Sequence, residues 1–317
     1  MSEKNKVALS YIALLTTSVI FGSSFFILKD ALDTLPTFFV LAFRFTVGVV
    51  AVGLIFIKSL LRMKWRSLLR GMAVGVVLVL AYVLQTLGLL YTTPGKNAFL
   101  TATYVILVPF AMWLFYREKP RWKNLAAALL CLGGIGLISL SGTLEMGVGD
   151  ILTLCSGIFY SLQIVFIKRF TAKDEAGHLL FGEILTAAIA FWVITLIKGE
   201  VPQSIEPTQW FPLLYLAFAV TGAAQILQML GQKYTSANTT SLIISLEAPF
   251  GVMFSVIFYG ERPTTQIYIG FALVFVAVLV SEIDWKEIWK KIKKPRPSVP
   301  PTHPTDEPQK EENKETI

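Results

Sequence analysis

The residues of this chain that could bind a ligand are polar side chains placed within long apolar stretches. Tyr82 and Gln85 lie three residues apart, and so do Tyr160 and Gln163, so each pair falls on one face of a helix. A polar group inside such a stretch avoids hydrocarbon and faces protein or water. We therefore expect these faces to line a cavity. The alternative left open is that they only hydrogen-bond one helix to another.

The same pattern recurs in other apolar stretches and defines the full set of candidate binding residues. Asn97 and Tyr104 lie seven residues apart, with Thr101 between them on the same helix face. The candidate binding residues are Ser24, Tyr82, Gln85, Asn97, Tyr104, Tyr160, Gln163, Gln225, Gln228 and Glu247. Tyrosine and glutamine with few charges suit a small polar or zwitterionic solute that also has an apolar part.

Three full charges fall within the apolar stretches: Arg44, Glu183 and Glu247. Arg44 and Glu183 align in the repeat described below, so they could face each other or contact separate partners. A buried ion pair between them could open as a gate, or could be a static pair with no further role. Glu247 precedes Pro249, which frees a backbone carbonyl and can kink a helix, and Pro109 can act similarly. A carboxylate beside such a break could bind a substrate amine or carry a coupling proton. It could also simply be solvated at the cavity wall or paired.

Motifs of the common enzyme classes are absent from the sequence. It has no GxSxG, HExxH, P-loop or CxxC pattern, and its only histidines are His178 and His303. Cys131 and Cys155 lie in apolar stretches, where we expect them to pack as small hydrophobic residues. We therefore expect neither an enzyme nor an ATP-driven pump, and neither a cofactor nor a bound metal.

The elements that must position these residues are membrane-spanning helices. The chain of 317 residues is 54% hydrophobic and only 15% charged, and its mean hydropathy is +0.63. A soluble domain of this size cannot bury so much apolar surface, so we expect an all-α integral membrane fold. Ten stretches approach the ~20 residues needed to cross a bilayer. They are residues 7–28, 36–57, 68–90, 97–117, 124–141, 150–168, 178–197, 211–232, 238–258 and 265–282.

Lysine and arginine are distributed unevenly over the connections between these stretches. With the N-terminus in the cytoplasm, fifteen of them before the C-terminal tail lie on the cytoplasmic side and four lie outside. The positive-inside rule then predicts both termini in the cytoplasm, for a multi-pass protein of the cell inner membrane. The net charge of +7 reflects this orientation and the tail, so we expect no nucleic-acid partner.

The sequence contains an internal duplication. Residues 82–120 align without a gap with residues 225–263 at an offset of 143, and both copies contain LQxLGxxYT and YxExP. The first two helices of each half align less clearly, at an offset of 139. The sequence thus predicts two related halves, residues 1–142 and 143–282. Because five helices per half is an odd number, the second half must be inverted relative to the first.

The composition changes after the last apolar stretch. Residues 283–294 place two Trp and two Ile residues on one helix face among lysines, which is typical of an amphipathic helix on an anionic cytoplasmic leaflet. The alternative is a frayed extension of the last spanning helix. Residues 295–317 are rich in Pro, Glu, Lys and Thr, so we expect a disordered tail there.

The chain resembles the drug/metabolite transporter superfamily, with two EamA-type halves. The resemblance rests on ten helices, FGSSFF at residues 21–26, Arg44 in a second helix headed by proline, and YxExP closing the fourth and ninth helices. It covers residues 7–282 and departs from the family's Trp-Gly in the first helix, where this chain has Phe21-Gly22. The resemblance implies a central cavity between the halves and the transport, often outward, of amino acids and other metabolites.

These observations together predict a secondary transporter that moves a small metabolite by alternating access, as an exporter of amino acids or related compounds. An uptake permease or an uncoupled facilitator is the alternative, and a membrane enzyme or a structural membrane protein fits the sequence less well. The expected partners are a small-molecule substrate, the lipid bilayer and, in a coupled transporter, the proton. We expect a monomer or a weak dimer.

Overall fold

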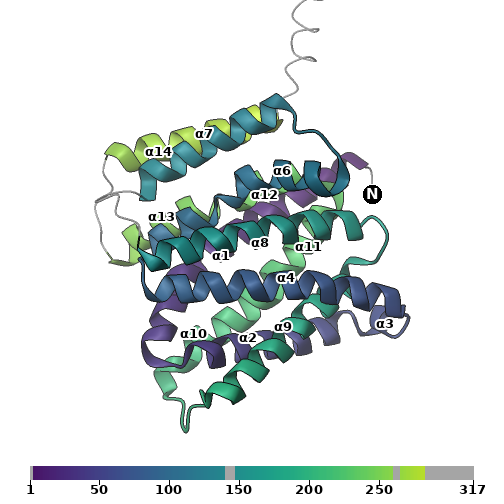
Figure 1. Cartoon of the computed structure of the whole chain (residues 1–317), viewed down its shortest axis with the longest axis vertical. Coiled ribbons are helices and arrows are strands. Elements are labelled where there is room, and N and C mark those ends of the chain that lie inside the picture. Colours follow the sequence, from purple (N-terminus) through teal and green to yellow (C-terminus); the bar gives the residue numbers. More distant parts are fainter. Residues whose placement is uncertain (1–2, 140–146, 260–264, 283–317) are drawn as a thin grey trace, which may run out of the picture. The chain divides into compact units, whose positions relative to one another are not determined.

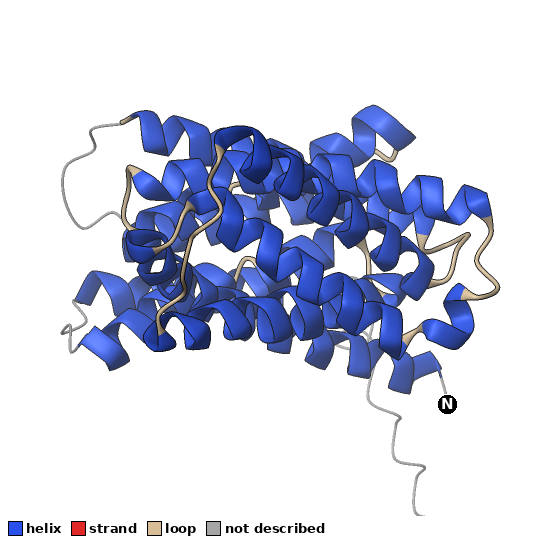
Figure 2. Ribbon diagram, turned by 90° about the horizontal axis from the view of Figure 1, so that it is seen from below, coloured by secondary structure: helices blue, strands red, loops and turns tan. Residues whose placement is uncertain are grey.

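Helices make up nearly all of the described chain. The computed structural model describes residues 3–139, 147–259 and 265–282, and every regular element within them is a helix (Figures 1 and 2). The longer helices are α1 (Glu3–Thr34), α2 (Thr37–Ile55), α4 (Trp65–Leu90), α5 (Pro94–Thr101), α6 (Tyr104–Tyr116), α7 (Trp122–Ser139), α8 (Val148–Phe170), α9 (Ala176–Lys198), α11 (Gln225–Tyr234), α12 (Ala237–Ile244), α13 (Glu247–Tyr259) and α14 (Thr265–Glu282). Shorter elements are α3 (Ile57–Leu60), the 3-10 helix η1 (Pro207–Gln209), α10 (Trp210–Leu214) and the π-helix η2 (Tyr215–Ala224).

Seven helical segments of the described chain are long and apolar enough to cross a membrane. They are Glu3–Thr34, Thr37–Ile55, Trp65–Leu90, Pro94–Tyr116, Val148–Phe170, Ala176–Lys198 and Pro207–Tyr234. Of the three other predicted spans, one falls on the shorter apolar helix α7, and the last two fall on α12 to α14. An all-α membrane protein is therefore confirmed, and the total of ten spans stays a prediction.

Two of the predicted spans are broken. The fourth is divided after Thr101 into α5 and α6, and the ninth is divided after Ile244 into α12 and α13. Pro249 lies in the first turn of α13, where a backbone N–H has no partner within the helix in any case. Pro109 lies inside α6 without ending it. The break after Ile244 lies at Ser245, one turn before Pro249, where the missing N–H of the proline frees a backbone carbonyl, so this break fits the expectation. The break after Thr101 lies further before Pro109, whose freed carbonyl belongs to Val105 inside α6, so the expectation for Pro109 is corrected.

The limits of several helices recur at the offset of the sequence repeat. α5, α6 and α7 begin and end 143 residues before α12, α13 and α14, respectively. The N-terminal caps of α5 and α12 also match. Thr93 Oγ1 accepts a hydrogen bond from the Lys96 N–H, and Ser236 Oγ accepts one from the Thr239 N–H. Matching residues therefore start and stop helices in both halves.

Two lysines make the same capping contact at aligned positions. Lys29, near the end of α1, donates a hydrogen bond to the backbone oxygen of Leu89 in the last turn of α4, at 3.2 Å. Lys168, near the end of α8, donates one to the backbone oxygen of Gln232 in the last turn of α11, at 3.3 Å. A cation stabilises the free carbonyls at the negative end of a helix. The offsets are 139 for the lysines and 143 for their partners.

Helices of the two predicted halves interlock. α4 packs against α8 and α9, α1 packs against α11 and α13, and α7 lies beside α14 (Figure 1). A Cβ atom on Gly71 of α4 would lie 2.6 Å from the backbone oxygen of Leu179 and 3.0 Å from the Cα of Gly182, so glycine is what permits this approach. Residues up to Glu282 form one compact unit, and the division into two halves stays a prediction.

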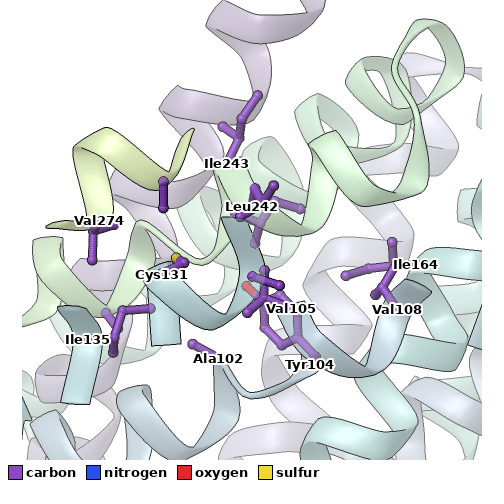
Figure 3. Close-up of a cluster of buried hydrophobic side chains, with 14 of the residues drawn as sticks. Ala102, Tyr104, Val105, Val108, Cys131, Ile135, Ile164, Leu242, Ile243 and Val274 are labelled. Carbon is purple, nitrogen blue, oxygen red and sulfur yellow. The ribbon is translucent and has the colours of Figure 1, made fainter. Parts of the chain in front are cut away.

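A large cluster of buried side chains joins α5, α6, α7 and α8 to α12 and α14. Figure 3 shows part of it, including Tyr104, Val105, Cys131 and Leu242. Cys131 is fully buried, with its Sγ 3.3 Å from Ser245 Oγ. It packs as a small apolar residue, as the sequence predicts.

Two predictions concern residues outside the described part of the chain. They are the amphipathic helix at 283–294 and the disordered tail at 295–317.

Candidate functional site

One cavity lies among α1, α2, α4, α5, α6, α8, α11, α12 and α13. The ten candidate binding residues all line it, although they are as far apart in sequence as Ser24 and Glu247. Arg44 lines it as well, whereas Glu183 lies behind the wall and contacts it through Gln163. The structure thus brings the predicted polar faces together, and their role in binding stays a prediction.

The two broken spans meet at this cavity. Tyr104 is the first residue of α6 and Glu247 is the first residue of α13, at the repeat offset of 143. Tyr104 Oη donates a hydrogen bond to Glu247 Oε1 at 3.1 Å, and both side chains are buried. A Cβ on Gly22 of α1 would lie 2.7 Å from the Glu247 backbone oxygen, so α1 closes tightly over this break. Breaks in membrane helices commonly form binding sites, because they expose backbone groups and reorient side chains.

Gln85 is the centre of a hydrogen-bond network on one side of the cavity. Its Oε1 accepts a hydrogen bond from Tyr160 Oη at 2.7 Å, and its Nε2 donates one to Thr101 Oγ1 at 3.1 Å. Asn97 Nδ2 donates to the Gln85 backbone oxygen at 3.1 Å and to Thr153 Oγ1 at 2.8 Å. These bonds join α4, α5 and α8, so on this side the polar residues do hold helices together while they line the cavity.

Two other glutamines of the cavity have fewer hydrogen-bond partners than Gln85. Gln225 and Gln228 align with Tyr82 and Gln85 at the repeat offset, and both are buried. Within the described residues their side-chain amides make no hydrogen bond to protein, so they can bond to whatever enters the cavity. The two halves of the site therefore differ, although their sequences align.

Arg44 and Glu183 are both buried, but they do not form the predicted ion pair with each other. Arg44 Nε donates to Thr221 Oγ1 at 2.8 Å, and its Nη2 donates to Tyr82 Oη at 3.3 Å. Glu183 Oε1 accepts a hydrogen bond from Gln163 Nε2 at 2.6 Å, and its Oε2 has no partner within the described residues. Each side chain contacts a separate, neutral partner instead, so the ion pair of the proposed gate is not formed in this conformation.

The cavity also has an apolar wall that the sequence analysis did not single out as such. Phe21, Phe25 and Leu28 of α1 lie on it, together with Ile164 of α8 and Ile244 of α12. The signal was available in part, because residues 21, 25 and 28 recur at helical spacing on the face that carries Ser24. Apolar residues inside a spanning helix carry no mark that separates a cavity face from a lipid face. Thr221, which accepts a hydrogen bond from Arg44, was also missed, although as a polar residue inside an apolar stretch it carries the signal that marks the other candidates.

The cavity is contracted in this conformation. The space open to the centre of a water molecule is about 40 Å³. A water needs roughly 10–15 Å³ of such space, so the cavity has room for a few waters only. A metabolite would require the surrounding helices to separate.

Two ion pairs lie near the ends of α8. Between α8 and α9, Asp174 accepts hydrogen bonds from Ser67 Oγ at 2.5 Å and from Arg70 Nη1 at 2.7 Å. Burial raises the pKa of Asp174, but these hydrogen bonds and the charge of Arg70 outweigh it and hold the pKa below the ordinary value of 3.8. At the other end of α8, Lys96 forms an ion pair with Asp150 at 2.6 Å. Both contacts link a residue of the first half to a residue of the second.

No group of three or more His, Cys, Asp or Glu side chains that could hold a metal ion occurs among the described residues. The polar atoms of the cavity come mainly from amides and hydroxyls, which suit an organic solute.

Comparison with known protein families gives a match over almost the whole chain up to Glu282. A family described as EamA-like transporter family matches twice, at residues 8–140 and 147–282. The two matched segments follow the two halves that the internal repeat predicts.

Individual relatives agree with the family match. A protein of Archaeoglobus fulgidus named as an uncharacterized transporter is 32% identical over 272 residues, which cover 85% of this chain and 84% of the relative. The uncharacterized transporter YcxC of Bacillus subtilis is 21% identical over 79% of this chain and 87% of its own length. A solved structure, titled only as the crystal structure of a protein, superposes with a TM-score of 0.73. It covers 92% of this chain and 100% of its own at 16% identity, which shows a shared fold.

Proposed function

Because the chain belongs to the EamA-like transporter family, we propose that it is a secondary transporter that exports amino acids or related small metabolites across the cytoplasmic membrane by alternating access. The observation that carries this proposal is the single cavity in which all ten polar candidates and Arg44 meet. Amides, hydroxyls and apolar side chains on one wall suit a small solute with a polar and an apolar end. The outward direction rests on the family resemblance.

The proposed architecture is ten spans in two inverted halves of five. Three observations support it: the two family matches, the helix limits that recur 143 residues apart, and the matching contacts of Lys29 and Lys168. Inverted halves can exchange conformations, and the exchange exposes one site to each side of the membrane in turn. The contracted cavity is consistent with a need for such motion.

The proposed orientation has both termini in the cytoplasm, on the charge distribution. Single cysteines at Lys173 and at Gln203, both exposed, would test it in a background that lacks Cys131 and Cys155. An impermeant thiol reagent added to intact cells should label the cysteine at 203 and not the one at 173. The reverse result would invert the orientation.

The proposed coupling site is Glu247. It is a carboxyl group on the cavity wall, it begins α13, and its hydrogen-bond partner among the described residues is the hydroxyl of Tyr104. A carboxyl group with a neutral hydrogen-bond partner at the meeting point of two broken spans is suited to exchange a proton between the two facing states.

The direction of transport can be tested with oriented membrane vesicles. Inside-out vesicles that contain the protein should accumulate labelled L-leucine faster than vesicles that contain the Gln228→Leu variant at equal abundance. Uptake confined to right-side-out vesicles would support the uptake permease instead. Equal uptake by vesicles with and without the protein, for leucine and a panel of other amino acids, would contradict the proposal.

A further inference from the structure

Arg44 is a buried cation that has no carboxylate partner among the described residues. Its side chain lies in α2, lines the cavity and is 1% exposed. Its two hydrogen-bond partners, Thr221 and Tyr82, are neutral. The ion pairs among the described residues do not include Arg44.

The protein compensates this charge only in part. The guanidinium carbon lies 5.0 Å from the ring centre of Tyr82 and 5.5 Å from that of Phe45, which gives favourable cation–π contacts. Two of the five N–H donors have a partner among the described residues, and the others do not. A buried charge left without a counter-ion is strongly unfavourable. An anion that enters the cavity would remove this cost.

The carboxylate of the cavity does not supply the missing anion. Glu247 accepts a hydrogen bond from Tyr104 and forms no ion pair with Arg44. The planar fork of an arginine matches a carboxylate, with which it forms two parallel hydrogen bonds. Thr221 and Tyr82 fix the orientation of that fork and are therefore positioning residues.

The remaining walls describe the rest of the solute. The amide oxygens of Gln225 and Gln228, whose side chains make no bond within the described protein, can accept hydrogen bonds from an ammonium group. Phe21, Phe25 and Ile164 supply apolar contacts on the same cavity. A carboxylate, an ammonium group and an apolar side chain together make an α-amino acid of the aliphatic kind.

We propose that Arg44 binds the carboxylate of the transported solute, and that the substrate class is α-amino acids with an apolar side chain. This inference rests on the proposed transport function and deepens it. It places the specificity of the site in a residue of α2, outside the broken spans that meet at Tyr104 and Glu247.

The first experiment uses the wild-type protein alone, purified in detergent. Binding is measured by calorimetry for L-leucine, for L-leucinamide, which lacks the carboxylate, and for 4-methylpentanoate, which lacks the ammonium group. We expect leucine to bind about tenfold to a hundredfold more tightly than leucinamide, the range for a charge-assisted hydrogen bond to a buried group. We expect 4-methylpentanoate to retain measurable affinity.

Variants then assign the effect to Arg44. Arg44→Lys keeps the charge, so it should fold, but it lacks the fork and should bind leucine at least about tenfold more weakly. Its affinity for leucinamide should be unchanged, a pattern that a purely structural role would not give. Arg66→Gln removes an exposed arginine outside the cavity and is the matched control, with wild-type affinity for all three probes.

The outcomes separate this inference from the proposed function. Equal binding of leucine and leucinamide to the wild type, with transport of leucine intact, would overturn the role of Arg44 and leave the transporter standing. Parallel losses of both probes in Arg44→Lys would also overturn it. If the wild type neither binds nor transports any amino acid, both proposals are overturned.

Discussion

At the scale of single residues, Gln85 and Gln228 are aligned in the repeat but have different surroundings. Gln85 bonds to Tyr160 and Thr101, whereas Gln228 has no side-chain bond within the described protein. We expect Gln85→Leu and Gln228→Leu both to reduce transport at near-normal membrane abundance. Gln85→Leu should also lower stability, by about 1–3 kcal/mol, because it leaves buried hydroxyl groups without a partner. Vesicle uptake and thermal melting measure the two effects.

The outcome for Gln228 is the cleaner test, because its substitution breaks no side-chain hydrogen bond within the described protein. Wild-type transport rates in both variants would mean that the polar faces serve packing alone, and the assignment of the cavity would fail.

The proposed coupling role of Glu247 can be tested by substitution. Glu247→Gln should abolish the response of transport to an imposed pH gradient while downhill exchange of substrate continues, because the amide cannot take up or release the proton. Proteoliposomes with and without a gradient measure this. Loss of both activities would indicate that Glu247 binds substrate directly, and full gradient-driven transport in the variant would exclude both roles. A wild type that ignores the gradient would be an uncoupled facilitator.

The sequence predicts which polar residues gather, but not their partners. Ser24 or Gln163 inside an apolar stretch must face protein or water, so a common cavity follows from the helical spacing alone. Whether Arg44 contacts Glu183 depends on the distance between α2 and α9. The alignment of the two halves of the sequence does not give that distance. Phe25 and Leu28 could not be told from residues that face lipid.

At the scale of elements, the close contact of α4 with α9 depends on Gly71. A Cβ there would meet the backbone oxygen of Leu179 at 2.6 Å, and backbone cannot move aside as a flexible side chain can. Gly71→Ala should therefore lower the melting temperature, with a cost of roughly 1–3 kcal/mol. Gly133→Ala in α7 is the matched control, since a Cβ there meets nothing within 4 Å, and it should leave stability unchanged or raise it. Equal effects would contradict the packing described.

The connection between α8 and α9 gives a prediction on pH. The pKa of Asp174 lies below 3.8 in the folded protein, so its bonds to Ser67 and Arg70 stabilise the fold fully above that value. The stabilisation is lost as the pH falls through the folded pKa. Thermal melting should therefore show Asp174→Asn less stable than wild type at pH 7, with the difference shrinking below about pH 4. A difference independent of pH would contradict this.

Element limits are predictable where composition changes and unpredictable where it does not. The apolar stretches and the turn residues Thr93 and Ser236 mark the starts of α5 and α12. The break after Ile244 lies one turn before Pro249 and can be expected from the sequence, because proline leaves the carbonyl at that spacing without a partner. The break after Thr101 has no proline at that spacing, so the sequence does not locate it.

At the scale of the whole molecule, the proposed transport requires movement between two states. The contracted cavity lies between interlocked helices. Ion pairs lie near both ends of α8: Lys96 with Asp150 and Arg70 with Asp174. A metabolite fits in the cavity only if the helices separate, because the open space holds a few waters. A carrier of this kind binds on one side, changes conformation and releases on the other.

Counterflow in proteoliposomes tests this central claim most directly. Vesicles that contain the purified protein are loaded with a high concentration of unlabelled L-leucine and diluted into a trace of labelled L-leucine. An alternating-access carrier predicts a transient accumulation of label above equilibrium, because exchange through one site is faster than net flow. The Gln228→Leu variant should reduce it. Entry of label without any such overshoot would identify an open channel and would contradict the account.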